Sequence, residues 1–128
     1  MVIFTDGASR GNPGPAAIGA VIKNERGQLI TSLSQAIGIT TNNQAEYQAI
    51  IAALKRALSL EAGHVDLRSD SELVVNQIKG QYRVKKASLR PLYLKVAQLA
   101  SQFESFTITC IPREENEEAD RLANLALK

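Results

Sequence analysis

Residues 2–34 read VIFTDGASRGNPGPAAIGAVIKNERGQLITSLS, and this stretch favours a β-meander at the start of the chain. Three apolar, partly β-branched runs are bounded by residues that favour turns, so we expect strands at residues 2–5, 17–23 and 28–34. The second and third runs are joined by a four-residue turn, Asn24 to Gly27. Glycine and proline crowd residues 7–15, which predicts an irregular loop between the first two strands.

The rest of the chain alternates between helix and strand patterns. Apolar residues from Tyr47 to Leu58 recur at helical spacing, so residues 43–60 are expected to form an amphipathic helix. The same reasoning predicts, in order, a strand at 65–68, helices at 71–78 and 89–103, a strand at 106–111 and a closing helix at 117–127. Because the fourth and fifth strands are each reached through helices, both should run parallel to their neighbours in a mixed α/β sheet.

Size and composition favour one domain over residues 1–128, because 45% hydrophobic and 22% charged residues are typical of a globular protein. The longest apolar runs, such as residues 16–22, are shorter than the ~20 residues that span a membrane, and no signal-peptide pattern precedes the first strand. We therefore expect a cytoplasmic protein without membrane contact. Cys110, the single cysteine, lies in the last predicted strand and is expected to be a small buried side chain.

Four acidic residues stand where a predicted strand ends or a predicted helix begins: Asp6, Glu46, Asp70 and Asp120. Each has a local explanation. Asp6 begins an Asp-Gly turn pair, and Glu46 follows Asn43 by three residues, as in a capping box. Asp70 could cap the helix that follows it, and Asp120 lies in a first turn, where the helix dipole stabilises acids.

The joint arrangement of these acids points to a metal site. Asp6 and Asp70 follow strands that should be adjacent and parallel, and Glu46 and Asp120 lie on helices that should pack against that sheet. Four converging carboxylates cannot all stay ionised without cations. Oxygen ligands without histidine or cysteine favour magnesium or manganese, and two such ions ~3.5–4 Å apart promote phosphodiester cleavage.

Charge along the chain suggests a nucleic-acid partner. Six basic residues and no acidic one lie between Glu72 and Glu104, namely Lys79, Arg83, Lys85, Lys86, Arg90 and Lys95. Such a run is either an ordinary solvated face or a surface for phosphate backbones. The sequence leaves both interpretations open.

Four ordered segments make the chain resemble a type 1 ribonuclease H over essentially its whole length. They are TDGASRGNPGP at residues 5–15, TTNNQAE at 40–46, RSDS at 68–71 and NEEADRLA at 116–123. The resemblance implies a five-stranded mixed sheet in the order 3-2-1-4-5 with helices on both faces. It further implies an endoribonuclease that hydrolyses the RNA strand of RNA/DNA hybrids and leaves 5′-phosphate and 3′-hydroxyl ends.

The same resemblance implies roles for individual residues. Asp6 would bridge two magnesium ions, with manganese as a possible substitute. Asp120 would help to hold the ion that activates the attacking water, and Glu46 and Asp70 would hold the ion that stabilises the departing 3′ oxygen. Five further positions match family contacts to 2′-hydroxyls, minor-groove edges or a DNA phosphate, and these are Asn12, Thr41, Asn42, Asn43 and Glu72.

The chain departs from the family pattern in two places. The loop before Asp120 lacks the histidine that many members carry, so Arg113 or Glu114 is a candidate replacement. Only residues 80–88 separate two helices where the best-known bacterial members carry a long basic protrusion, so this is a short form. Tyr82, Lys85 and Lys86 are then expected to form a reduced substrate surface.

Two alternatives to a hybrid-cleaving enzyme stay open at this point. A non-catalytic RNase H-like binding module would keep the basic residues and asparagines but would usually lose one or more acids. A nuclease of the same fold could instead act on DNA. In each case we expect a monomer.

Overall fold

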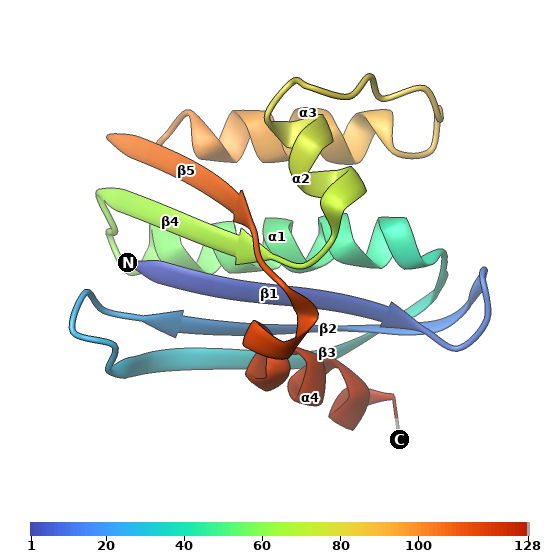
Figure 1. The fold of residues 1–128 in the computed structure, drawn as a ribbon, viewed down its shortest axis with the longest axis horizontal. Coiled ribbons are helices and arrows are strands. Elements are labelled where there is room, and N and C mark those ends of the chain that lie inside the picture. The colour runs from blue at the N-terminus through green and yellow to red at the C-terminus, as the bar shows by residue number, and fades with distance from the viewer. Residues whose placement is uncertain (128) are drawn as a thin grey trace.

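In the computed structural model, which describes residues 1–127, five strands form one sheet in the order β3-β2-β1-β4-β5 (Figure 1). The strands are β1 Val2–Ser9, β2 Gly14–Lys23, β3 Leu29–Thr40, β4 His64–Ser69 and β5 Ser105–Cys110. β1 and β3 are antiparallel to β2, whereas β4 is parallel to β1 and β5 is parallel to β4. The predicted mixed sheet and its strand order are confirmed.

Helices cover both faces of this sheet, as predicted. They are α1 Asn42–Ser59, α2 Glu72–Ile78, α3 Arg90–Ala100 and α4 Glu117–Ala126, with a short 3₁₀ turn, η1, at Arg113–Glu115. In Figure 1, α1, α2 and α3 lie on one side, and α4 crosses β2 and β3 on the other. The main core lies between α1 and the sheet, where Tyr47, Ile50 and Leu54 are fully buried.

Two glycines let the helices approach the sheet closely. A Cβ atom at Gly7 would lie within 3.0 Å of the backbone of Ala45 and Glu46 in α1. One at Gly19 would lie within 3.0 Å of the backbone of Ala119 and Ala123 in α4. Gly19 pairs with Asp6, the neighbour of Gly7, so the two glycines face opposite sides of the sheet. Gly7 in β1 therefore lets α1 pack closely on one face of the sheet, and Gly19 in β2 lets α4 pack closely on the other.

The prediction of an irregular loop at residues 7–15 was wrong. β1 continues to Ser9 and β2 begins at Gly14, so only residues 10–13 form the connection. Arg10 N–H donates to the carbonyl of Pro15 at 2.7 Å and closes the hairpin. The glycines that suggested a loop are used instead for close backbone approaches inside a regular ladder.

The expectation that Cys110 is buried was also wrong, because its side chain is exposed. β5 is an edge strand with one neighbour, so the burial that a central strand provides is missing there. Among residues 1–127, no helix is both long and apolar enough to cross a membrane.

Candidate active site

The site begins where β1 runs past the end of β4. The two strands pair from Val2 with Asp66 to Thr5 with Ser69, after which β4 stops and β1 continues. Asp6 is the first residue of β1 beyond that pairing, and Asp70 is the first residue after β4. The two carboxylates therefore come from neighbouring positions, although Asp6 lies inside its strand rather than at its end.

Glu46 reaches the same place from the second turn of α1. Its side chain is buried, and its Oε1 accepts a hydrogen bond from the Gly7 N–H at 2.7 Å. The suggested capping pair of Asn43 with Glu46 was wrong, because the capping box of α1 is formed by Thr41 and Gln44. Glu46 is thus free of any helix-capping role and faces Asp6.

Asp120 approaches from the opposite face of the sheet, in the first turn of α4. Its carboxylate is about one third exposed, and its Oδ1 lies 3.9 Å from Nη2 of Arg113. The suggestion that Asp70 caps α2 was also wrong, because the Ser71 side chain accepts the capping bond from Val74 N–H. Neither Asp70 nor Asp120 is therefore needed as a side-chain cap.

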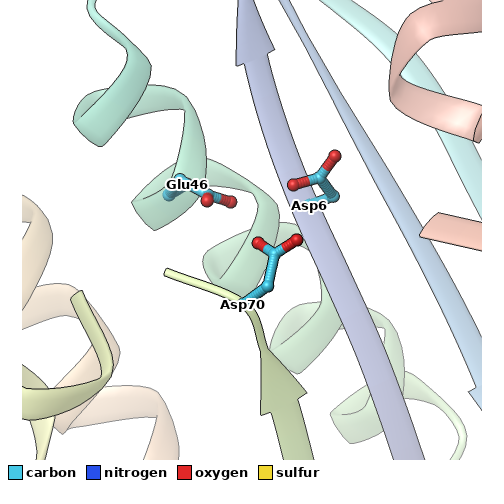
Figure 2. Close-up of side chains that lie close together, drawn as sticks. All are labelled: Asp6, Glu46 and Asp70. Atoms are coloured by element: carbon cyan, nitrogen blue, oxygen red, sulfur yellow. The ribbon is translucent and has the colours of Figure 1, made fainter. Parts of the chain in front are cut away.

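Three of the four carboxylates form a group with the geometry of a metal site. One oxygen from each of Asp6, Glu46 and Asp70 lies within 4.8 Å of the others. Figure 2 shows these three side chains, from β1, α1 and the end of β4, pointing toward one another. Asp120 stands outside this tight group but lines the same cavity of about 490 Å³, together with Gly7, Ala8, Ser9, Asn42, Ser71, Arg113 and Asn124.

Burial and mutual repulsion disfavour the ionised form of this cluster. Burial, followed by the charges of Asp70 and Asp120, raises the pKa of Asp6 to about 8. Burial and the charge of Asp6 raise the pKa of Glu46 well above its ordinary value, and burial also raises the pKa of Asp70. Arg113 partly offsets the shifts of Asp6 and Asp70. The site therefore lacks positive charge, which divalent cations would supply.

Of the residues predicted to contact the substrate near the metals, Asn42 lines this cavity, and the others lie outside its lining. Asn12 is exposed in the β1–β2 connection, and its Oδ1 accepts a hydrogen bond from Asn42 N–H at 3.0 Å. Asn42 is exposed and lines the cavity, and Asn43 is half-buried beside it. The Thr41 side chain caps α1 by accepting a hydrogen bond from Gln44 N–H. Glu72 is exposed at the first position of α2 and does not line the cavity.

The predicted basic surface lies apart from the acidic cavity. Tyr82 lines a separate hollow of about 540 Å³ between α2 and α3, and Lys85 lines a neighbouring one. Lys86 is exposed in the same connection. Arg83 and Arg90, which belong to the predicted basic run, also line the first hollow. Sequence reasoning missed Tyr93, which lines it as well.

The two candidates for the missing histidine separate clearly. Arg113 lines the acidic cavity, whereas Glu114 lines a different hollow with Phe4 and Lys23. The structure therefore brings Arg113, but not Glu114, to the carboxylates. Sequence reasoning also missed Ser9, Ser71 and Asn124 in the cavity wall. Ser9 and Ser71 lie within the matching segments, and Asn124 directly follows the last of them.

Comparison with known proteins gives the family. The family model described as "Reverse transcriptase-like" matches residues 4–126. Ribonuclease HI of Halobacterium salinarum is 44% identical over 97% of this chain, and the match covers 62% of that protein. The N-terminal RNase H domain of Rv2228c from Mycobacterium tuberculosis has a TM-score of 0.96 at 45% identity, covering 99% of this chain and 98% of that one. LC11-RNase H1, solved in complex with an RNA/DNA hybrid, has a TM-score of 0.93 at 42% identity, covering 98% and 95%.

The fold and the converged carboxylates define an RNase H-like domain. The chain belongs to the reverse transcriptase-like family, and its relatives there include type 1 ribonucleases H, as the four sequence segments predicted. It spans less than two thirds of the length of the curated relatives named here, 62% of the Halobacterium protein and 35% of the whole mycobacterial Rv2228c.

Proposed function

We propose that this chain is an endoribonuclease that hydrolyses the RNA strand of RNA/DNA hybrids with two divalent metal ions. The observation that carries the proposal is the group formed by the buried Asp6 and Glu46 and the half-buried Asp70, in which one oxygen of each lies within 4.8 Å of the others, where β1 extends beyond the end of β4. The similarity to LC11-RNase H1, a protein solved with an RNA/DNA hybrid, supports the substrate class.

The residues present fit divalent cations. An all-oxygen donor set with raised carboxyl pKa values suits magnesium, with manganese as a substitute. Asp6 would contact both ions, because it lies in the group with Glu46 and Asp70 and also interacts with Asp120. Glu46 and Asp70 would hold the ion on the leaving-group side, and Asp120 the ion on the water side.

The chemistry that two divalent ions supply at such a site is activation of the attacking water and stabilisation of the departing 3′ oxygen. The rest falls to the protein's own groups. The Gly7 N–H holds the Glu46 carboxylate in place, which fixes one ligand before substrate arrives. Arg113 is 81% exposed at the cavity rim, so its guanidinium can reach a substrate phosphate as well as Asp120.

Recognition of the RNA strand would fall to the exposed amides beside the cavity. Asn12 and Asn42 are already joined by a hydrogen bond, which orders the β1–β2 connection against the start of α1. Amide groups both donate and accept, as a 2′-hydroxyl does, so this rim can distinguish RNA from DNA. The hollow at Tyr82, Arg83 and Arg90 would take the DNA strand backbone through cationic and aromatic contacts.

The test is cleavage of a labelled RNA/DNA hybrid, an all-RNA duplex and an all-DNA duplex, with magnesium or with a chelator, followed by mapping of product ends. We expect magnesium-dependent cleavage of the RNA strand in the hybrid, with 5′-phosphate ends. Asp70→Asn should reduce the rate by roughly 1,000-fold, because a lost metal ligand removes several kcal/mol of transition-state stabilisation. Asp66→Asn is the matched control, since Asp66 lies in β4, the strand that Asp70 follows, but pairs with Arg68.

Each other outcome has a defined meaning. Hybrid binding without cleavage would identify a non-catalytic module, and faster cleavage of all-DNA duplex would identify a DNA nuclease. Wild-type cleavage by Asp70→Asn would overturn the assignment of metal ligands.

The proposal extends to the setting in which the enzyme works. We infer a cytoplasmic monomer, and the single cysteine, which fits a reducing compartment, supports the cytoplasmic setting. Sedimentation of the purified protein at micromolar concentration tests the monomer directly, and a dimer would contradict it.

A further inference from the structure

Asn116 is a buried polar residue in the connection between η1 and α4. Only 1% of it is exposed. Its Oδ1 and the Thr5 Oγ1 are the two buried side-chain atoms that lack a hydrogen-bond partner among residues 1–127. Both lie beside the same contact, in which Asn116 Nδ2 donates to the backbone carbonyl of Thr5 at 2.8 Å.

That contact stands at the point where the sheet opens. Thr5 is the last residue of β1 that pairs with β4, and Asp6 follows it. At this point, side chains rather than a neighbouring strand form hydrogen bonds with backbone groups of β1. Asn116 donates to the Thr5 carbonyl, and Glu46 accepts from the Gly7 N–H. The position of Asp6 is therefore fixed on one side by Asn116 and on the other by Glu46.

Asn116 also touches the element that carries Asp120. Its backbone carbonyl accepts a hydrogen bond from Asp120 N–H at 3.1 Å, which begins α4. The Asn116 side chain, through its bond to the Thr5 carbonyl, thus ties the start of α4 to β1 directly before Asp6.

Helix capping does not explain this side chain. An asparagine that precedes a helix normally uses its oxygen to accept a backbone N–H of the first turn. Asn116 makes no such bond, and its Oδ1 is left unpaired. An unpaired buried oxygen is a cost that a merely structural residue would be expected to avoid.

We infer that Asn116 is a positioning residue that holds Asp120, at the start of α4, at the correct distance from Asp6 in β1, so that these carboxylates can share metal ions. The inference rests on the proposed function. Partners that orient metal ligands typically contribute about 10–100-fold to metal affinity. Asn116 should contribute in this range although it contacts no metal itself.

The experiment compares Asn116→Ala and Asn116→Ser with wild type. Serine is one bond shorter than asparagine, so it cannot span to the Thr5 carbonyl, but its hydroxyl can cap α4 and keep the helix stable. Tyr47→Phe is the matched control, because it removes another buried side-chain hydrogen bond, from Tyr47 to Gln77 at 2.7 Å, that involves none of the four carboxylates. For each variant we would measure the Mn²⁺ Kd by calorimetry, the metal-free Tm, and kcat and KM for hybrid cleavage.

We expect both Asn116 variants to raise the Mn²⁺ Kd about tenfold or more and to lower kcat, with KM for the hybrid within about twofold of wild type. Tyr47→Phe should lower Tm but keep the wild-type Kd and kcat. If the Asn116 variants behave like Tyr47→Phe, the positioning role is overturned. If wild type itself neither binds Mn²⁺ nor cleaves the hybrid, the proposed function fails first, and the inference fails with it.

Discussion

At its amino end, β4 begins with His64, whose Nε2 lies 3.2 Å from Glu104 Oε2 and whose Nδ1 lies 2.7 Å from Ser105 Oγ. At its carboxyl end, β4 is followed by Asp70, which faces Asp6 and Glu46. The first group is exposed and joins a base to an acid. The second is largely buried and joins acids only.

At the amino end of β4, groups of opposite character pair with each other. At the carboxyl end, like-charged carboxylates repel one another unless a cation binds between them. Exposed complementary pairs contribute little to stability and bind nothing further. Buried like charges destabilise the folded chain unless a cation binds. This uncompensated negative charge makes the carboxyl end of β4 a candidate active site. The sheet carries both, about one strand length apart.

The largest expected effect is on the pH dependence of stability without metal. The pKa of Asp6 is raised from 3.8 to about 8, so its stabilising contribution is complete below about pH 4 and is lost as pH rises toward 8. The metal-free Tm should therefore fall by about 5 °C or more between pH 5 and pH 8.5. Calorimetric scans in the presence of a chelator measure this directly.

Added magnesium and two substitutions test the same pH dependence of Tm. Magnesium should reverse the fall, because cations bind the ionised carboxylates. Asp6→Asn should flatten the pH dependence and raise the metal-free Tm at pH 8.5, whereas Asp66→Asn at the ion-paired position should leave the slope unchanged. A pH-independent Tm in wild type would show that the carboxylates do not repel one another as described.

A smaller effect is expected at Arg113, the cation that faces the acidic cavity. Arg113→Ala should slow hybrid cleavage about tenfold and should raise the pKa values of Asp6 and Asp70, since Arg113 lowers both. The rate profile should shift to higher pH, while Tm changes little because the side chain is 81% exposed. Arg121→Ala, an exposed arginine on α4 outside the cavity, is the control for loss of charge alone. Equal effects of the two substitutions would show that Arg113 acts only through its contribution to the overall charge, and not through its position at the cavity.

The smallest effect is expected at the other end of β4. His64→Ala and Glu104→Gln should change Tm by no more than about 3 °C and should leave cleavage unchanged, because the pair is 64% and 76% exposed. Thermal scans and the hybrid assay check both points. A marked loss of cleavage would show that the two ends are coupled.

Local patterns in the sequence were sufficient for most of the fold. The apolar spacing in α1 placed Tyr47, Ile50 and Leu54 in the core, where all three are fully buried. The helices before β4 and β5 implied parallel strands, which the sheet has. The errors fell where a residue's use depends on a distant partner. Gly7 was interpreted as a loop residue because nothing local shows that the backbone of Ala45 and Glu46 will approach it.

The site was partly predictable for the same reason. The four acids could be nominated because each stands at a strand or helix boundary, and residues 5–15, 40–46, 68–71 and 116–123 carry a family resemblance. The caps assigned to Asn43 and Asp70 were wrong, since capping depends on backbone geometry that several neighbours can satisfy. Arg113 and Glu114 could not be separated, because adjacent residues in a turn point to different sides.

By itself, the sequence determined the element types, the parallel strands and the identities of the acids, since these follow from periodicity and side-chain chemistry within short windows. Only the tertiary structure decided that β1 outruns β4 at Thr5 and that Asn116 and Glu46 take the backbone groups left open there. These contacts join residues 39 and 111 positions apart in the chain. Their geometry depends on how helices pack on both faces of the sheet, which no local pattern encodes.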